Sequence, residues 1–207
     1  MEDQWLAWAK RLQAISSTGV FFGASDFDRE RYEEIAAIAD NMLAQLGQVP
    51  LQTIAGLIPD FGEGYATPKV DVRGAIVEDN KILLVRERLD GKWTLPGGYA
   101  DVGISAADNI VKEIREEASI DVIVKRPYAI IHKARHAYDA DARDFYKLYF
   151  LCERTGEAPP SPGMETVETG FFPADRLPVL STGRVIKEHI ELAFRHHASP
   201  TLPVTFD

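Results

Sequence analysis

The sequence predicts an α+β protein in which a small helical domain precedes a larger domain built on a mixed sheet. Two observations favour this fold. The first fifty residues carry apolar side chains at helical spacing, whereas strand-like runs dominate the chain after Pro68. In this second part the runs lie on both sides of one helix, an order typical of a mixed sheet packed with helices. We therefore expect a helical domain and linker at residues 1–65 and a second domain at residues 66–207.

Composition and charge exclude several classes of protein. The chain has 207 residues, of which 45% are hydrophobic and 27% are charged, as in ordinary globular proteins. No segment approaches the roughly 18 uncharged apolar residues that a membrane helix needs. The net charge of -9 disfavours a general nucleic-acid binder, although a small anionic substrate bridged by metal remains compatible. The acidic start and the single cysteine, Cys152, fit a reducing compartment, so we expect a cytoplasmic protein.

Two amphipathic helices are expected in the first fifty residues. The second helix begins at a capping box, Ser25 to Asp28, and ends before Gly47. Two such helices alone make a poor core, so they must pack on the rest of the chain or on a second subunit, and we favour a homodimer. Residues 59–68 are the best linker candidate. The apolar stripes comprise Trp5, Ala9, Leu12 and Ile15 in the first helix and Tyr32, Ile35, Ala39, Met42, Leu43 and Leu46 in the second.

The second domain alternates strands with helices. A turn is expected at residues 78–80, where Glu, Asp and Asn separate two strand-like runs. A capping box at Ser105 and Asp108 opens a helix over residues 106–118, and a last helix is expected over residues 184–197. Strands are expected at residues 70–76, 81–86, 122–124, 128–133, 146–153 and 168–172.

A cluster of carboxylates on the first of these helices is the most informative feature. Glu113, Glu116 and Glu117 are spaced i, i+3, i+4 and therefore project from one face of the helix. A solvated acidic face is one interpretation; a divalent cation is the other, and ligands that are all oxygen select Mg²⁺ or Mn²⁺ over zinc. The preceding Gly97 and Gly98 favour the second, because glycine lets the backbone approach a phosphate or expose a carbonyl to metal.

This segment resembles the Nudix box, Gly-x5-Glu-x7-Arg-Glu-U-x-Glu-Glu-x-Gly-U, in which U is aliphatic. With the first glycine at Gly98, the three glutamates named above match the three later glutamates of the pattern. The chain departs from the pattern at three positions: Ile104 replaces the first glutamate, Lys112 the arginine and Ser119 the last glycine. Because Ile104 removes a carboxylate outright, a protein that only binds its ligand, or one whose catalytic base lies elsewhere, stays open.

The first fifty residues resemble the helical extension of a Nudix subgroup that includes CDP-choline and ADP-ribose pyrophosphatases. The likeness rests on residues 5–15 and 31–35, so the resemblance covers nearly the whole chain. It implies a Nudix-type α/β/α sandwich and a homodimer built partly through the extension. It also implies an enzyme that hydrolyses the pyrophosphate bond of a nucleoside diphosphate linked to another group, such as CDP-choline or ADP-ribose.

The same resemblance implies the roles of individual residues. Glu113, Glu117 and the carbonyl of Gly97 would hold Mg²⁺, with Mn²⁺ as the alternative, and Glu116 would be a ligand or its neighbour. Independently of the resemblance, Glu165 and Glu168 are candidates for the general base, with an ordinary acidic loop as the alternative. For the substrate, Arg73, Arg86 and Arg88 could clamp phosphate or be surface arginines, and Gly98 and Tyr99 are candidate binding residues. Tyr99, Trp93 and Phe145 could stack on a base, but we favour core packing for Trp93.

Two other functions stay open. One is a non-catalytic, nucleotide-binding regulatory module, and the other is a nuclease that acts on RNA ends with the same metal site. Substrate specificity is expected in loops such as residues 134–144. Cys152 is expected to be a buried, inert thiol, and His132 and His136 lie too far from a soft ligand to indicate zinc.

Overall fold

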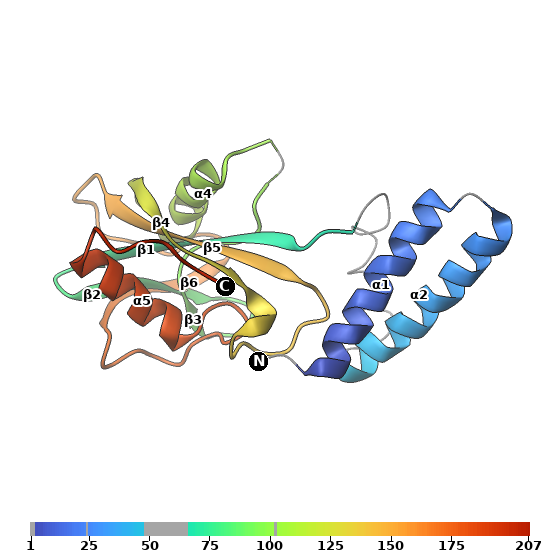
Figure 1. Ribbon diagram of the computed structural model, residues 1–207. Coiled ribbons are helices and arrows are strands. Elements are labelled where there is room, and N and C mark those ends of the chain that lie inside the picture. The colour runs from blue at the N-terminus through green and yellow to red at the C-terminus, as the bar shows by residue number, and fades with distance from the viewer. Residues whose placement is uncertain (1–2, 24, 48–65, 102) are drawn as a thin grey trace. The chain divides into compact units, whose positions relative to one another are not determined.

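The computed structural model describes residues 3–23, 25–47, 66–101 and 103–207. These residues form two compact units, shown in Figure 1. The helical unit combines residues 1–69 with residues 133–145, and the sheet unit combines residues 70–132 with residues 146–207. Most of the expected linker, and the boundary after residue 65, lie outside the described residues.

The helical unit is built on α1 (Gln4–Phe22) and α2 (Asp26–Leu46). The capping box is confirmed, because the amide of Asp28 donates to the Ser25 hydroxyl at 3.1 Å. Of the expected stripe on α1, Ala9 is buried together with Leu6 against Leu43, whereas Trp5 is 57% exposed, so packing of the whole stripe on a second subunit stays a prediction. Small residues allow this packing. On α2, Ala39 is also fully buried.

The sheet unit contains a mixed sheet, as expected. Its strand order is β3-β2-β1-β5-β4-β7, and β6 also pairs with β2. Most strand pairs are antiparallel, but β4 and β7 run parallel. The strands are β1 (Lys69–Glu78), β2 (Lys81–Glu87), β3 (Trp93–Thr94), β4 (Val122–His132), β5 (Phe145–Arg154), β6 (Thr166–Pro173) and β7 (Thr205–Phe206).

Two helices cover opposite faces of this sheet and complete an α/β/α sandwich (Figure 1). On α4 (Ala106–Ala118), Ile110 and Ile114 pack in one core cluster with Phe150 of β5. On α5 (Lys187–Ala198), the ring of His189 lies 5.3 Å from the ring of Tyr149. Because neighbouring residues of a strand point to opposite faces, Phe150 and Tyr149 place α4 and α5 on different sides.

Several boundaries differ from the sequence-based expectations for physical reasons. The two runs expected at residues 122–124 and 128–133 form one strand, β4, whose register shifts on both sides of Arg126 and Pro127. The last helix begins at Lys187 rather than at residue 184, because the amides of Arg184 and Val185 both donate to the carbonyl of Ser181 in a separate turn. The strands β3 and β7 have two residues each, too few for a recognisable pattern.

Candidate active site

Residues 95–98 form a turn beside β1, here called the glycine turn, which is one wall of the site. The amide of Val72 donates to the carbonyl of Gly98 at 2.8 Å, and the amide of Gly74 donates to the carbonyl of Pro96 at 2.9 Å. Gly97 between them has a φ of 137°, and a Cβ there would lie 2.0 Å from the Val72 carbonyl oxygen. Only glycine fits this position, so the sequence fixes where the backbone approaches β1.

The helix α4 forms the facing wall. Ser105 caps its first turn, accepting a hydrogen bond from the Asp108 amide at 3.1 Å. Its buried side carries Ile110, Ile114 and Glu117, and the glycine turn meets the helix on this side at Glu117. At its end Ser119 adopts the left-handed conformation, with a φ of 54°. This is the position of the last glycine in the box, so Ser119 keeps the backbone geometry at some cost in strain.

Glu117 is almost fully buried, with 5% of its surface exposed. One of its oxygens, Oε2, accepts a hydrogen bond from the Gly97 amide at 2.9 Å. Burial raises the pKa of Glu117 to about 8, opposed by the charge of Arg73 and by the Gly97 hydrogen bond. The charges of Glu87 and Glu113 raise this pKa further. The Glu117 carboxylate thus connects the glycine turn to α4, and the positive charge that the protein places near it does not offset the cost of its burial.

Glu113 and Glu116 lie in different surroundings. Glu113 is half-buried, and a Cβ on Gly98 would lie 3.0 Å from its Oε2, so the missing side chain leaves the space that this carboxylate faces. Burial raises the pKa of Glu113, and the charge of Arg73 opposes that effect. The carboxylate of Glu116 is exposed, 3.7 Å from the ammonium group of Lys112. The structure therefore brings Glu113 and Glu117 to the turn and leaves Glu116 at the rim.

Of the departures from the box pattern, Lys112 lies beside Glu116. The side chain of Ile104 is partly exposed and supplies no carboxylate. The ammonium group of Lys112 on α4 lies 2.7 Å from the carboxylate of Asp101. This ion pair holds the chain that follows the glycine turn against α4. These contacts show how the helix and loop stay together with lysine in place of arginine.

The two candidates for the general base, Glu165 and Glu168, lie in different surroundings. Glu165 lies on a segment fixed to the end of α4, where the Thr166 hydroxyl donates to the Glu117 carbonyl at 2.7 Å. Gly163 of the same segment also packs closely on the end of α4, since a Cβ at this position would lie 1.6 Å from the Glu116 carbonyl oxygen. The charge of Glu165 raises the pKa of Glu113, which places this exposed carboxylate near the site. Glu168 instead pairs with Arg86 across β6 and β2, at 3.3 Å.

All three arginines proposed as phosphate clamps contact protein acceptors. Arg73 is 4% exposed, so the surface alternative is wrong for it. Arg86 pairs with Glu168 and also donates to the carbonyl of Gly91 at 2.8 Å. Arg88 donates to the carbonyls of Met164 and Thr166, at 3.1 and 3.3 Å, and so supports the segment that carries Glu165.

Sequence reasoning missed three buried charged residues around the site. Asp71 and Lys147 pair at 2.6 Å across β1 and β5, and both are almost fully buried. Glu87, at the end of β2, is 6% exposed and lies 3.3 Å from Arg184. A signal existed for Asp71, because Asp71 and Arg73 share one side of an otherwise apolar strand. The partners on distant strands left no local signal.

The three aromatic residues proposed to stack on a base lie in different surroundings. The ring of Trp93 packs edge-on against Phe172, with centroids 4.7 Å apart, which confirms packing within the protein. Phe145 is buried, with Lys133 and Arg143 over its ring at 4.9 and 5.1 Å. Tyr99 is 48% exposed beside Gly98.

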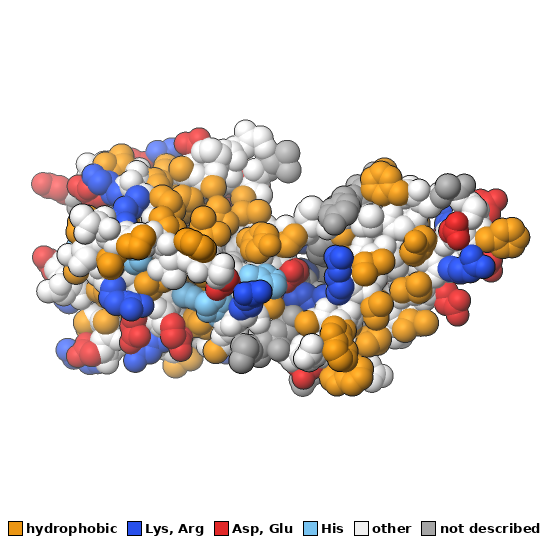
Figure 2. Space-filling model, viewed as in Figure 1, with side chains coloured by type: hydrophobic (Ala, Val, Ile, Leu, Met, Phe, Trp, Pro, Cys, Tyr) orange, Lys and Arg blue, Asp and Glu red, His pale blue; other side chains and the backbone are white. Residues whose placement is uncertain are grey.

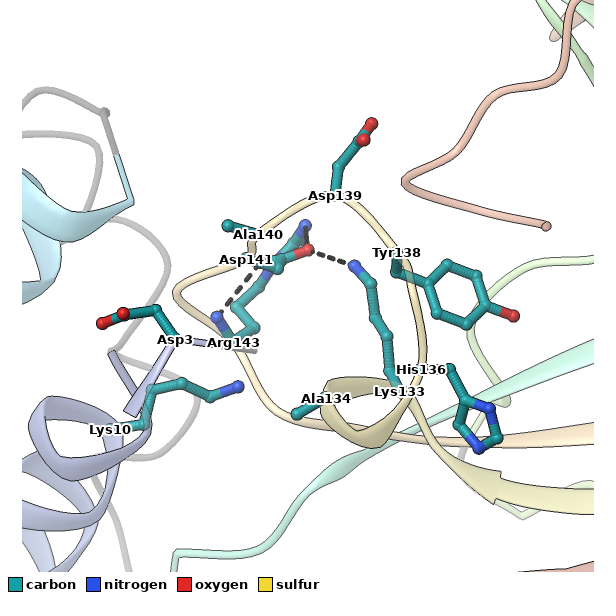
Figure 3. A pocket seen from close by; sticks show the side chains of 10 residues that line it. All are labelled: Asp3, Lys10, Lys133, Ala134, His136, Tyr138, Asp139, Ala140, Asp141 and Arg143. Atoms are coloured by element: carbon teal, nitrogen blue, oxygen red, sulfur yellow. Dashed lines mark hydrogen bonds and ion pairs between the residues drawn. The ribbon is translucent and has the colours of Figure 1, made fainter. Parts of the chain in front are cut away.

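The loop expected to carry specificity belongs to the helical unit. It lines a small pocket of about 80 Å³ together with Asp3 and Lys10 (Figure 3). Asp141 accepts from Lys133 at 2.8 Å and from Arg143 at 2.9 Å. Burial raises the pKa of Asp141, but these two cations outweigh it and bring the pKa to about 2. Lys10 of α1 pairs with Asp144 at 3.1 Å, which attaches the loop to the helices.

The donor set fits a hard divalent cation. In the described parts of the chain, no three His, Cys, Asp or Glu side chains converge as a metal-binding group. The available donors are two carboxylates, Glu113 and Glu117, and backbone carbonyls of the glycine turn. Mg²⁺ suits such a set because it keeps several waters and takes only one or two carboxylates. A cation would also stabilise the ionised form of Glu117, which burial alone disfavours.

Comparison with known proteins gives two family matches. Residues 3–58 match the family described as UDP-X-like, N-terminal oligomerisation domain, and residues 68–193 match the NUDIX domain. Among curated proteins, the chain is 38% identical over 208 residues to the putative ADP-ribose pyrophosphatase YjhB of Bacillus subtilis, covering all of this chain and 99% of the relative. In the described residues, no helix has the length and apolar character required to cross a membrane.

Two crystal structures are also similar. An ADP-ribose pyrophosphatase from Streptococcus suis is 42% identical, with a TM-score of 0.62, and the match covers 68% of this chain and all of that one. A UDP-X diphosphatase is 34% identical, with a TM-score of 0.63, and the match covers 98% of both chains. The likeness thus includes both the glycine turn with its helix and the helical extension.

Proposed function

Because the chain belongs to the Nudix family and is a pyrophosphohydrolase, we propose that it hydrolyses nucleoside diphosphates linked to a further group. ADP-ribose is the first candidate substrate, since two of its relatives are named ADP-ribose pyrophosphatase. A UDP-linked compound follows from the name of the third, and CDP-choline from the resemblance of the extension. The observation that carries the proposal is the buried Glu117 carboxylate bound to the Gly97 amide.

The cofactor in this proposal is Mg²⁺, with Mn²⁺ as a substitute. Glu113, Glu117 and the Gly97 carbonyl would hold it, and Glu116 would act only from the rim. When bound, the ion supplies neutralisation of the diphosphate charge and a lower pKa for its water. The chain itself contributes rigidity: the glycine turn is bonded to β1 on one side and to Glu117 on the other.

Glu165 is the general base in this proposal. It is exposed, its segment is anchored to the end of α4, and its charge acts on Glu113. Glu168 is the weaker candidate, because its carboxylate pairs with Arg86. For the substrate, Gly98 leaves space beside Glu113, and the exposed ring of Tyr99 offers a stacking surface. Arg86 lies on β2 and Arg88 follows that strand directly. Each could bind phosphate only through N–H groups that do not already donate to the protein.

The proposed oligomer is a homodimer formed through the helical unit. Large apolar side chains are exposed along α1 and α2, where Figure 2 shows hydrophobic side chains gathered on the helices. A mostly apolar hollow of about 450 Å³ lies between the helices, lined by Trp5, Ile38, Asn41, Met42, Gln45 and Leu46. Such a surface suits a second copy, since monomers rarely expose large apolar patches. A cytoplasmic location stays a prediction.

A substrate panel tests the function. ADP-ribose, CDP-choline and a UDP-sugar would be incubated with Mg²⁺ or Mn²⁺, and the products would be separated by chromatography. We expect cleavage into two phosphate-bearing products, and Glu117→Gln to lower kcat/KM by more than about 100-fold, since even residues that only support a metal ligand contribute 10–100-fold. Glu153→Gln on β5 is the control, because this exposed carboxylate lies 2.9 Å from the ammonium group of Lys125 and outside the candidate site.

Three outcomes would contradict the proposal. The absence of turnover across the panel with both metals would reject the hydrolase activity on these substrates. Tight nucleotide binding that Glu117→Gln leaves unchanged, again without hydrolysis, would indicate a binding module. Strongly salt-dependent RNA binding would indicate the RNA-end nuclease instead.

A further inference from the structure

Three charged side chains lie buried beneath the glycine turn. Asp71 accepts two hydrogen bonds from the Arg73 guanidinium, Nε to Oδ1 at 3.0 Å and Nη2 to Oδ2 at 2.9 Å. The ammonium of Lys147 donates to the same Oδ1 at 2.6 Å. All three residues are at most 5% exposed. A buried ionic group of this kind costs desolvation, and apolar residues of similar size are often at least as stabilising.

This cluster is bonded to the turn that faces Glu117. The remaining terminal nitrogen of Arg73, Nη1, donates to the carbonyl of Leu95 at 3.1 Å. Leu95 begins the segment that runs through Gly97 to Gly98. The amides on either side of Arg73 hold the same segment, Val72 through Gly98 and Gly74 through Pro96. Further along, Tyr99 pairs with Asp71 as an antiparallel bridge.

The turn is therefore fixed by backbone bonds from β1 and by one guanidinium whose direction the carboxylate of Asp71 sets. Lys147 fixes Asp71 from β5 in turn. A guanidinium is planar and its donors form a rigid fork, so the bidentate pair determines where Nη1 points. Displacement of Leu95 would move Gly97, whose amide holds Glu117.

We propose that Lys147, Asp71 and Arg73 are positioning residues for the catalytic centre: together they hold the glycine turn so that Gly97 and Glu117 meet a divalent cation in one arrangement. The proposal rests on the proposed function for its catalytic meaning, but the positioning itself is a property of the turn. None of the three residues needs to contact substrate or metal.

The test uses Arg73→Lys and Asp71→Asn in the full chain. The lysine keeps the buried charge but lacks the fork, so it cannot bind Asp71 and Leu95 together. We expect the Kd for Mn²⁺ alone, measured by calorimetry, to rise about 10-fold or more, as for residues that orient metal ligands. Hydrogen exchange of the Gly97 amide, followed by NMR, should be faster in both variants. Where turnover is measurable, kcat should fall more than KM rises.

Arg154 and Glu78 provide a matched control. They form an equally bidentate pair between the same two strands, at 3.0 and 2.7 Å, but at the end away from the turn. Arg154→Lys should lower the melting temperature and leave the Mn²⁺ affinity and the Gly97 exchange unchanged.

The opposite result would overturn the proposal. If Arg73→Lys lowers the melting temperature as Arg154→Lys does and keeps wild-type Mn²⁺ affinity and Gly97 exchange, the cluster serves stability alone. If Asp71→Asn does not fold, Arg73→Lys still decides the question. Neither readout requires a substrate, so a chain inactive on the whole panel would reject the proposed function without deciding the role of the cluster.

Discussion

Neighbouring glutamates on α4 show how one residue type acquires two environments. Glu117 points under the glycine turn and is nearly buried, and burial raises its pKa to about 8. Glu116, one position earlier, is exposed beside Lys112. The difference follows from the helix geometry, because a step of one residue rotates the side chain by about 100°. Spacing alone groups these residues, and only the packing of the helix ranks them.

This ranking gives a first prediction. Glu116→Gln should lower kcat/KM by less than about 10-fold, because an exposed group that acts from the rim contributes a small electrostatic effect. Glu117→Gln should lower it far more, as stated above. Steady-state kinetics at saturating Mg²⁺ would measure both. Equal losses in the two variants would mean that Glu116 is a ligand on the same footing as Glu117.

A second prediction concerns Asp141 in the helical unit. Its pKa is lowered to about 2 from an unfolded value of 3.8, so its stabilising effect is present above about pH 4 and is lost as the pH falls toward 2. This shift corresponds to roughly 2 kcal/mol in the free energy of unfolding. The stability gap between the wild type and Asp141→Asn should therefore narrow by about that amount between pH 5 and pH 2. Urea denaturation across this range would measure the gap, and a gap independent of pH would refute the assignment.

At the scale of elements, two helices begin with the same capping box. The hydroxyls of Ser25 and Ser105 each accept from an amide three residues later at 3.1 Å, and each donates to that residue's carboxylate at 2.7 Å. The two boxes are alike in geometry and differ in what their helices carry. The box at Ser105 begins α4, which bears the candidate metal ligands, whereas the box at Ser25 begins α2.

This pair allows a third, internally controlled prediction. Ser105→Ala and Ser25→Ala should each lower the stability of the unit concerned by about 1 kcal/mol, the usual effect of losing such a cap. Only Ser105→Ala should also weaken Mn²⁺ binding, because fraying of α4 loosens the helix that carries Glu113 and Glu117. Urea denaturation and calorimetry would separate the two effects. Equal Mn²⁺ affinities in both variants would show that the first turn of α4 does not position the site.

The elements also show what could be predicted from the sequence. The bounds of α4 were predictable because its cap and its apolar spacing are local signals, and these signals also place Glu113 and Glu117 on one helix. The turn at Asp79 and Asn80 was predictable for the same reason, since both residues adopt positive φ angles at low cost. Lys147 was missed because its partner, Asp71, lies 76 residues away and only the sheet brings them together. Buried ion pairs between strands leave no periodic pattern.

At the scale of the whole molecule, the chain passes between its two units three times. Residues 133–145 leave the sheet unit between β4 and β5 and belong to the helical unit. There Asp144 pairs with Lys10 of α1, and its carbonyl accepts from the Lys69 amide at 2.9 Å. The helical unit is thus assembled from two distant parts of the sequence, residues before β1 and the segment that precedes β5.

The exposed face of α1 and α2 yields the last prediction. Ile38 is 53% exposed and lines the apolar hollow together with Trp5. If a second copy covers this face, Ile38→Glu would bury a charge without a partner and raise the Kd of the homodimer by on the order of 100-fold. Sedimentation equilibrium should show a dimer for the wild type and a monomer for the variant at equal concentration. Ile123→Glu is the control, because Ile123 is similarly exposed on β4 and should leave the dimer intact. A wild type that sediments as a monomer, or an Ile38→Glu variant that stays dimeric, would place the subunit contact elsewhere or exclude it.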